Sequence, residues 1–387
     1  PPKDKKLPDS KIEDLKKWID MGAPWPKAEI VTAKKPGEFT EEERGWWAFQ
    51  PLKKTTPPEV SGIRIANPVD RFIGQKLVAE KIPQAPQADR RELVRRLYYD
   101  LHGLPPTAEQ VAAFIEDKRP DAYERLVDEL LASPNYGVRW GQHWLDVARY
   151  AESDGYREDA YRPNAWPYRD YVIRSFNEDK PYDQFVREQI AGDEINPDDP
   201  NVLIGTAFLR HGIYEWNQRD AEGQRKLMVE EMTDVTGEVF LGLSFACAKC
   251  HDHKFDPILQ KDYYRLKSFF TGVQWREDMV LATATQKAEH AEKMKAWEDA
   301  SREPREALEA VLKPKLDQSR RKATEMFPDE VKAMVAKPEA ERLPYDKVIS
   351  YLVDRQVMVD QNKMLAKFKQ TPSPLIDAMK PFDETKP

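Results

Sequence analysis

The stretch Cys247-Ala248-Lys249-Cys250-His251-Asp252-His253-Lys254-Phe255-Asp256-Pro257 holds both cysteines of the 387-residue chain and two of its six histidines. The C-x-x-C-H order at its start is typical of covalent attachment of a c-type haem. In that arrangement each thiol bonds to one haem vinyl group, and the adjacent imidazole becomes the proximal iron ligand. Two residues between the thiols allow one short turn to place both sulfurs along the same porphyrin edge. We therefore predict that Cys247, Cys250 and His251 bind one haem c.

Zinc is the main alternative occupant of this motif. It would use Cys247, Cys250, His251 or His253, together with a carboxylate from elsewhere in the chain. Structural zinc sites usually contain a second pair of cysteine or histidine ligands, and the chain has no second cysteine pair. A chance pair of buried cysteines is the simplest alternative, but the only two cysteines of the sequence stand in register with a histidine.

The composition is that of a folded, helix-rich protein. Ten Trp, fifteen Tyr and fifteen Phe argue against a disordered chain, and the 33% of charged residues favours long solvated helices. The net charge of -7 is dispersed, so no nucleic-acid partner is expected. No apolar run is long enough to span a bilayer. The opening Pro1-Pro2-Lys3-Asp4 suggests a processed or trimmed fragment. Because covalent haem is normally attached outside the cytoplasm, we expect a periplasmic or secreted protein.

Helical periodicity and chain breaks divide the sequence into five segments. Residues 1–26 contain one helix, at 8–22, and residues 27–66 form a linker rich in Lys, Glu and Pro. Within the linker, Trp46-Trp47-Ala48-Phe49 is expected to dock onto another surface. The main domain spans 67–283, with Asn67 and Pro68 starting its first helix. Its helices are expected at about 67–81, 88–101, 107–116, 120–132, 137–152, 167–177, 181–190, 222–243 and 262–270.

The remaining residues differ in character from the main domain. Residues 284–370 alternate Lys, Glu and Arg with sparse apolar positions, which predicts a projecting helical arm. Four prolines, Pro304, Pro314, Pro328 and Pro338, are expected to divide this arm into shorter helices. Residues 371–387 form a tail with little pattern. The predicted fold is therefore mainly α, a multi-helical haem-binding domain with a projecting helical arm.

The opposite side of the haem would be supplied by other segments. On the helix expected at 137–152, His143, Asp146, Tyr150 and Asp154 follow one another at helical spacing. They are our candidates for acid–base groups of a haem enzyme, with His143 as a distal iron ligand. A buried histidine bonded to Asp146 is the structural alternative. Met232 is a second distal candidate, although its helix face indicates core packing first.

The other histidines are expected to have supporting roles. His253 should point away from an iron bound by His251 and hydrogen-bond to a propionate, a carboxylate or a backbone carbonyl. His102 and His211 each precede a glycine at a helix end, where imidazole commonly caps the terminus. Between them in sequence, the polar and aromatic stretch 152–170 suits a sugar-like polar ligand or a wet domain interface.

Four long, ordered motifs suggest a family. They are Asn67-Pro68-Val69-Asp70-Arg71-Phe72-Ile73 continuing through Asp100-Leu101-His102-Gly103-Leu104-Pro105-Pro106-Thr107, then His143-Trp144-Leu145-Asp146-Val147-Ala148-Arg149-Tyr150-Ala151, Phe176-Asn177-Glu178-Asp179-Lys180-Pro181-Tyr182-Asp183, and Cys247 through Ile258. Over about residues 46–275 the chain resembles the large planctomycete-type cytochrome c proteins. Residues 1–26 resemble the terminal helix of the smaller cytochrome c domain that often precedes this one. His102 stands where family members often have Thr, so no family role is carried over to it.

The resemblance implies a multidomain, extracytoplasmic haem protein, and it leaves three functions to compare. The first is electron transfer by one haem c to the neighbouring cytochrome c domain or to a redox partner protein. The second is a haem-dependent oxidoreductase, peroxidase-like or acting on a carbohydrate-derived substrate, which would use the four acid–base candidates. The third is a non-redox module that holds zinc and binds glycan; the family also suggests polysaccharide as a partner.

Overall fold

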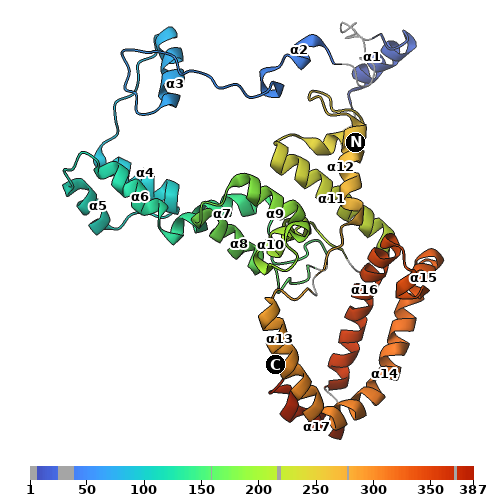
Figure 1. Cartoon of the computed structure of the whole chain (residues 1–387). Helices are drawn as coiled ribbons and strands as arrows, with labels where there is room; N and C mark the ends of the chain where they lie inside the picture. Colours follow the sequence, from blue (N-terminus) through green and yellow to red (C-terminus); the bar gives the residue numbers. More distant parts are fainter. Residues whose placement is uncertain (1–6, 25–38, 158, 216–218, 277–278, 370–372) are drawn as a thin grey trace.

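The computed structural model describes residues 7–24, 39–157, 159–215, 219–276, 279–369 and 373–387 (Figure 1). The protein is mainly helical, as predicted, with 67% of its residues in helices. The described residues contain no strand; their one extended pairing is an isolated bridge between Ser153 and Tyr161. No helix in the described ranges is long and apolar enough to cross a membrane.

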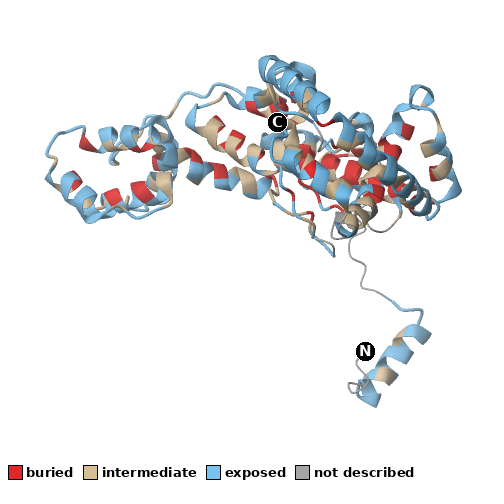
Figure 2. Cartoon of the chain, turned by 90° about the horizontal axis from the view of Figure 1, so that it is seen from below, coloured by how far each residue is buried: buried red, intermediate tan, exposed pale blue. Residues whose placement is uncertain are grey.

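The N-terminal segment packs little against the rest of the chain. Helix α1 (Asp9–Asp20) has no buried residue, and in Figure 2 it lies apart from the body where the buried residues gather. The short helices α2 (Glu41–Arg44) and η1 (Trp47–Phe49) follow. Trp46 and Trp47 are both exposed, so the docking expected for this stretch is not made within the described structure.

Capping residues start several helices where the sequence predicted them. Helix α3 (Pro68–Ala79) begins with Pro68 after Asn67, whose side chain accepts hydrogen bonds from the amides of Val69 and Asp70. Helices α4 (Arg90–His102), α5 (Ala108–Glu116) and α6 (Ala122–Leu131) then form a small bundle. Its own core consists of Val94, Leu97, Tyr98, Phe114, Ala122 and Leu130.

The main body is built from α7 (Pro134–Val147), α8 (Trp166–Asn177), α9 (Tyr182–Ile195), α10 (Pro200–Gly205), η2 (Thr206–Arg210) and α11 (Ala221–Leu241). Helices α7 and α8 approach closely at Gly137, where a Cβ would overlap the carbonyl of Ile173. Large aromatic and aliphatic side chains of α8, η2 and α11 fill the core, among them Tyr168, Tyr171, Val172, Phe208, Met228 and Met232. Helix α12 (Gln260–Phe269) and the turn η5 (Phe270–Gly272) complete the body.

The first helix of the body differs from the prediction at both ends. A helix was expected over 137–152, but α7 begins at Pro134, because Ser133 caps it and proline suits the first helical position. It ends at Val147, and Arg149 then adopts a left-handed backbone conformation with a φ of 59°. Helix α10 and the turn η2 were not predicted at all.

The arm contains α13 (Ala284–Ala300), α14 (Arg302–Thr324), α15 (Asp329–Ala336), the turn η6 (Glu339–Glu341), α16 (Pro344–Lys369) and α17 (Pro374–Asp383). Two of the four prolines act as expected: Pro328 precedes α15 and Pro338 precedes η6. Pro304 instead lies in the first turn of α14, where its missing N–H is not needed, and α14 continues through Pro314. The tail is also partly helical, since α17 lies within it.

The inner end of the arm belongs to the core of the body. Phe327, Val331, Ile349 and Leu352 are buried in the same cluster as Met228 and Met232. At the outer end the indole Nε1 of Trp297 on α13 donates to the carbonyl of Phe382 on α17, at 2.8 Å. Figure 1 shows the arm helices extending away from the body between these two contacts.

Candidate functional site

The C-x-x-C-H motif lies in the connection between α11 and α12, which pack side by side at one end of the body (Figure 1). Helix α11 ends at Gly242, whose left-handed φ of 64° turns the chain out of the helix. The chain then forms the short 3-10 helix η4 (Phe245–Lys249), with Cys250 at its C-terminal end. The "motif loop" below denotes residues 243–260.

The geometry of η4 places the two thiols on its outer side. A 3-10 helix has three residues per turn, so side chains three positions apart eclipse one another. Cys247 and Cys250 have this spacing and are both exposed free thiols. Ala248, between them, is fully buried. Both cysteine side chains are therefore open to solvent, while Ala248 between them packs against the protein.

The motif loop packs on a small hydrophobic core of its own, separate from the main core. It consists of Phe245, Ala248, Ile258 and Tyr263, with Leu243 and Leu266 packed against it. Phe245 can approach α11 only because position 237 is glycine: a Cβ there would overlap the Phe245 ring. Tyr263 stacks on Phe245 with ring centroids 5.7 Å apart. We call these residues the base of the motif loop.

Buried charges join this base to α11. The ammonium groups of Lys249 and Lys267 lie 2.5 Å and 3.1 Å from the carboxylate of Glu230. Burial opposes ionisation of Glu230, but hydrogen bonds from the two lysines lower the pKa of this carboxyl overall. One turn further on, the Tyr263 hydroxyl donates to Asp234 at 2.7 Å. Burial nevertheless raises the pKa of Asp234.

The imidazole of His251 is oriented with one nitrogen free. Its Nδ1 lies 2.7 Å from the carbonyl oxygen of Asp252. Because a carbonyl only accepts hydrogen bonds, Nδ1 carries the proton and Nε2 keeps its lone pair. The residue is exposed, so Nε2 is available to an external ligand. A carbonyl partner on the other ring nitrogen is the usual support of a metal-binding histidine.

His253 has the supporting role predicted for it, through a different partner. Its Nδ1 accepts hydrogen bonds from the backbone amides of Asp256 at 2.8 Å and Phe255 at 3.3 Å. Among the partners predicted from the sequence, a backbone carbonyl is not the partner of this nitrogen, since the two amides are donors. The Asp256 carboxylate lies 3.3 Å from the same nitrogen, but Nδ1 has no proton to donate while it accepts from amides. His253 therefore fastens the turn that follows His251.

Three further hydrogen bonds hold the motif loop together and join it to α12. The amide of Gln260 donates to Asp252 at 2.8 Å, and the backbone amide of His253 donates to the carbonyl of Ile258 at 2.8 Å. The Tyr264 hydroxyl donates to the carbonyl of Lys249 at 3.2 Å. The loop conformation that exposes the thiols is thus fixed by its own hydrogen bonds.

The four acid–base candidates do not share one environment. His143 is exposed and lines a cavity between α7, α8 and α9, while Asp146 is exposed on the same helix. The Tyr150 hydroxyl donates to Glu152 at 2.8 Å. Asp154 is buried, and its carboxylate lies 2.7 Å from Arg162 and 2.9 Å from Arg210. The helical spacing that linked them in sequence ends at Val147.

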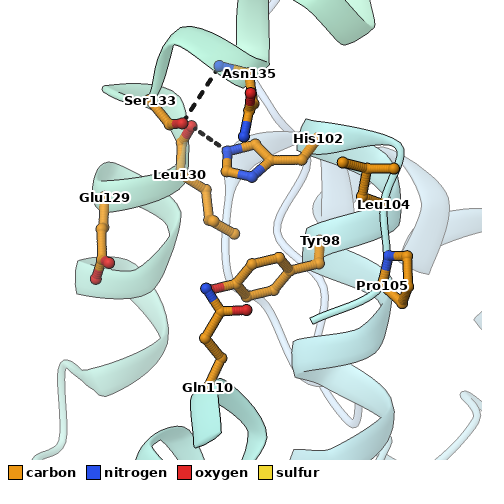
Figure 3. A pocket seen from close by; sticks show the side chains of 9 residues that line it. All are labelled: Tyr98, His102, Leu104, Pro105, Gln110, Glu129, Leu130, Ser133 and Asn135. Atoms are coloured by element: carbon orange, nitrogen blue, oxygen red, sulfur yellow. Dashed lines mark hydrogen bonds between the residues drawn. The ribbon is translucent and has the colours of Figure 1, made fainter. Parts of the chain in front are cut away.

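The remaining distal and histidine candidates are accounted for by packing. Met232 is fully buried in the main core, the packing role that its helix face indicated. His102 lies at the end of α4 with its Nε2 3.0 Å from the carbonyl of Leu130, at the end of α6 (Figure 3). It therefore satisfies a C-terminal carbonyl of a neighbouring helix, beside a cavity of about 330 Å³ that Tyr98 and Gln110 also line.

His211 occupies a buried polar cluster that the sequence did not reveal. Its ring packs against Tyr168, with centroids 4.6 Å apart, and against Tyr150 at 5.3 Å. Burial, together with the nearby positive charges of Arg162, Arg149 and Arg210, lowers the pKa of His211 to about 3. The imidazole is therefore neutral at physiological pH. It does not cap a helix end, because neither ring nitrogen has a hydrogen-bond partner among the described residues.

The ligands that the motif offers can be compared with those that zinc and haem require. Among the described residues, no group of three or more His, Cys, Asp or Glu side chains is arranged to hold a metal ion. The pair of outward thiols and the free Nε2 match the donor set of a c-type haem. Leu241 and Phe255, on either side of the motif, are 59% and 77% exposed, which provides apolar surface for a macrocycle to cover.

The fold and the motif loop together define a helical protein with an exposed, braced C-x-x-C-H turn. The family model PSCyt2, described as a protein of unknown function (DUF1549), matches residues 68–275, which is more than half of the chain. The chain therefore belongs to the PSCyt2 family. No curated protein and no solved structure matches it. The family match agrees with the resemblance found from the sequence motifs.

Proposed function

We propose that this chain is a c-type cytochrome that holds one haem through Cys247, Cys250 and His251. The observation that carries the proposal is the form of the motif loop: both thiols face solvent on one side of η4, and the His251 Nε2 is free. A covalently held haem supplies a one-electron redox centre. The protein supplies the thiols that anchor it, the imidazole that ligates it and the rigid loop that fixes both.

The exposure of the motif supports electron transfer as the role. A redox centre near the surface can exchange electrons with a partner at short range, and the exposed Leu241 and Phe255 border it. We propose that the partner is a neighbouring cytochrome c domain or a separate redox protein. Covalent haem attachment also requires an extracytoplasmic location, so we propose that the protein is periplasmic or secreted.

A pyridine haemochrome assay on protein made in a host competent for haem attachment tests this proposal. The wild type should show the spectrum of a haem bound through two thioethers, and Cys247→Ala or Cys250→Ala should reduce or abolish covalent haem. His251→Ala should also lower the haem content, and His290→Ala is its matched control, because His290 is an exposed histidine on α13. Equal haem content in the wild type and the double variant Cys247→Ala/Cys250→Ala would contradict the proposal.

The optical spectrum of the oxidised protein distinguishes electron transfer from a haem enzyme. A low-spin spectrum that does not respond to cyanide or peroxide supports electron transfer. A high-spin spectrum that changes with either ligand would instead indicate an open coordination position, and His143→Ala would then test whether the cavity beside α7 contributes to it.

A further inference from the structure

A cavity of about 410 Å³ lies between α7, α8 and α9, and none of its lining residues belongs to the motif loop. Six of the ten residues that line it are aromatic: Tyr136, Trp140, Trp144, Phe176, Tyr182 and Phe185. The size is within the range of sites for small ligands. Nothing in the proposed haem chemistry uses this cavity, so its residues need a separate explanation.

The inner wall of the cavity is rigid. The indole of Trp144 meets the Phe185 ring edge to face, with centroids 4.9 Å apart. Its Nε1 donates to the Tyr168 hydroxyl at 3.1 Å and to Gln189 at 2.9 Å. Both partners are fully buried. A ligand would therefore meet an ordered wall and would not have to organise it, which lowers the entropic cost of binding.

The mouth of the cavity is also held in place. The side chain of Asn177 accepts from the amide of Gly137 at 2.8 Å and donates to the carbonyl of Pro134 at 3.2 Å, which joins the start of α7 to the end of α8. Trp140 and Tyr182 are 39% and 60% exposed. The rim thus offers two aromatic rings with part of their surface open to water.

Polar groups stand among these rings. His143 contacts the Trp140 ring, with centroids 5.6 Å apart, and is exposed. Asp179 is exposed at the α8–α9 connection and has a left-handed φ of 49°, a conformation that is uncommon outside glycine. Lys180 lies 2.5 Å from the buried carboxylate of Glu188, with its ammonium over the Tyr171 ring. The lysine charge is therefore already compensated.

The combination of rings and polar groups selects among ligand classes. A wholly apolar ligand would remove His143 and Asp179 from water without giving them hydrogen bonds, which is costly. A cation would be drawn to the Trp140 and Tyr182 faces, but it would leave the hydrogen-bonding capacity of the His143 imidazole unused. A saccharide ring has an apolar face that stacks on an aromatic side chain and hydroxyl groups around its edge. It matches both kinds of residue.

We propose that this cavity binds a saccharide unit, which stacks on Trp140 or Tyr182 and hydrogen-bonds to His143 and Asp179. The site is independent of the haem proposal, because no residue is shared between the two. The exposed Asp179 carboxylate and the exposed His143 imidazole give the site its polarity: ring hydroxyls donate to Asp179, and the imidazole of His143 can donate or accept.

Ligand-observed NMR and calorimetry with three probes, methyl β-D-glucopyranoside, cellobiose and maltose, test the proposal. At least one should bind with a Kd of about 1 mM. Trp140→Ala and Tyr182→Ala should each weaken that binding by about tenfold or more, since each removes a stacking face. Trp140→Phe should retain part of it. Tyr156→Ala, which removes a 66% exposed aromatic outside the cavity, should bind as the wild type does.

Two results would overturn the proposal. One is the absence of binding by all three saccharides up to about 50 mM, with the protein shown to be folded by its circular dichroism. The other is saccharide binding that Trp140→Ala and Tyr182→Ala both leave unchanged. Tetramethylammonium serves as a competing cationic probe: if it binds at the cavity more tightly than the saccharides, the site is a cation site. Loss of haem by Cys247→Ala should alter none of these results.

Discussion

In the loop that follows His251, Nδ1 of His253 accepts hydrogen bonds from two backbone amides, and exchanging this residue tests the structure of the motif directly. The side-chain oxygen of asparagine occupies nearly the same position as Nδ1 of histidine, whereas that of glutamine reaches the position of Nε2. His253→Asn should therefore keep an acceptor for the amides of Phe255 and Asp256. His253→Gln should lose it, although it retains a polar side chain of similar length.

The size of the effect follows from the two hydrogen bonds. The bond from Asp256, at 2.8 Å, is of full strength, while the bond from Phe255, at 3.3 Å, is weak. Phe255 is also exposed, so water can replace the partner of its amide. Losing both bonds should therefore cost about 1.5 kcal/mol of local stability. That corresponds to an opening equilibrium of the loop larger by about tenfold.

Hydrogen exchange of peptides that cover residues 251–259 measures this opening. Exchange at the Asp256 amide should be about tenfold faster in His253→Gln than in the wild type, and close to wild type in His253→Asn. Exchange in α4, which packs against α5, α6 and α7, is the internal reference. The interpretation fails if glutamine preserves protection and asparagine loses it, because His253 would then act through Nε2.

Three further predictions concern the base of the motif and the core. Gly237→Ala should lower the free energy of unfolding by about 1–3 kcal/mol, since the new methyl group overlaps Phe245; Gly272→Ala, with open space around it, should change it little in the same urea titration. Asp154→Asn should lower the free energy of unfolding by about 3 kcal/mol, because it removes the buried negative charge between Arg162 and Arg210. An unchanged midpoint of the urea titration would argue against a stabilising role of these ion pairs. Tyr263→Phe should lower the free energy of unfolding by about 2 kcal/mol at neutral pH, because it removes the hydroxyl that donates to Asp234. Burial raises the pKa of Asp234, so the ionised carboxyl destabilises the fold increasingly as pH rises through its folded pKa. The loss of stability in Tyr263→Phe should therefore shrink on acidification, as Asp234 becomes protonated. A loss that grows on acidification would show that Asp234 is not the partner that matters.

Most helices follow from local signals in the sequence. Asn67 before Pro68, Thr107 before α5 and Gly242 after α11 stop or start helices through hydrogen bonds or backbone conformations within a few residues. Such signals act at short range, so sequence order is enough to find them. The end of α7 has no such signal. The sequence from 137 to 152 has a helical pattern, but Ala148 is fully buried and Arg149 has a left-handed backbone conformation, so the helix stops before them.

Proline and tail positions were judged by the same local reasoning, with less success. Pro304 lies in the first turn of α14, and Pro314 lies in its interior. The sequence predicted that both would end a helix, but α14 contains both of them. Helix α17 is held by α14 and by Trp297 of α13. Both contacts come from residues distant in sequence, so the sequence of the tail alone did not predict this helix.

The two candidate sites differ in the same way. The thiols and the histidine of the motif are adjacent in sequence, and their spacing predicted the site. The supports from Glu230, Asp234 and Tyr263 come from two other helices and were not predicted. The aromatic cavity brings together Trp140 of α7 and Tyr182 of α9, which are distant in sequence. The close approach of α7 to α8 at Gly137 could not be predicted from either helix alone. His143 was singled out, but the sequence placed it beside Tyr150 and Asp154, which the helix end separates from it.

The central claim is that Cys247 and Cys250 anchor one haem, and the intact mass of the purified protein tests it most directly. Protein from a host that attaches c-type haem should be heavier than its sequence by the mass of one haem. The extra mass should survive denaturation, and it should be absent from the double variant Cys247→Ala/Cys250→Ala. An unmodified mass for the wild type, in a host that loads a control cytochrome c in the same culture, would contradict the account.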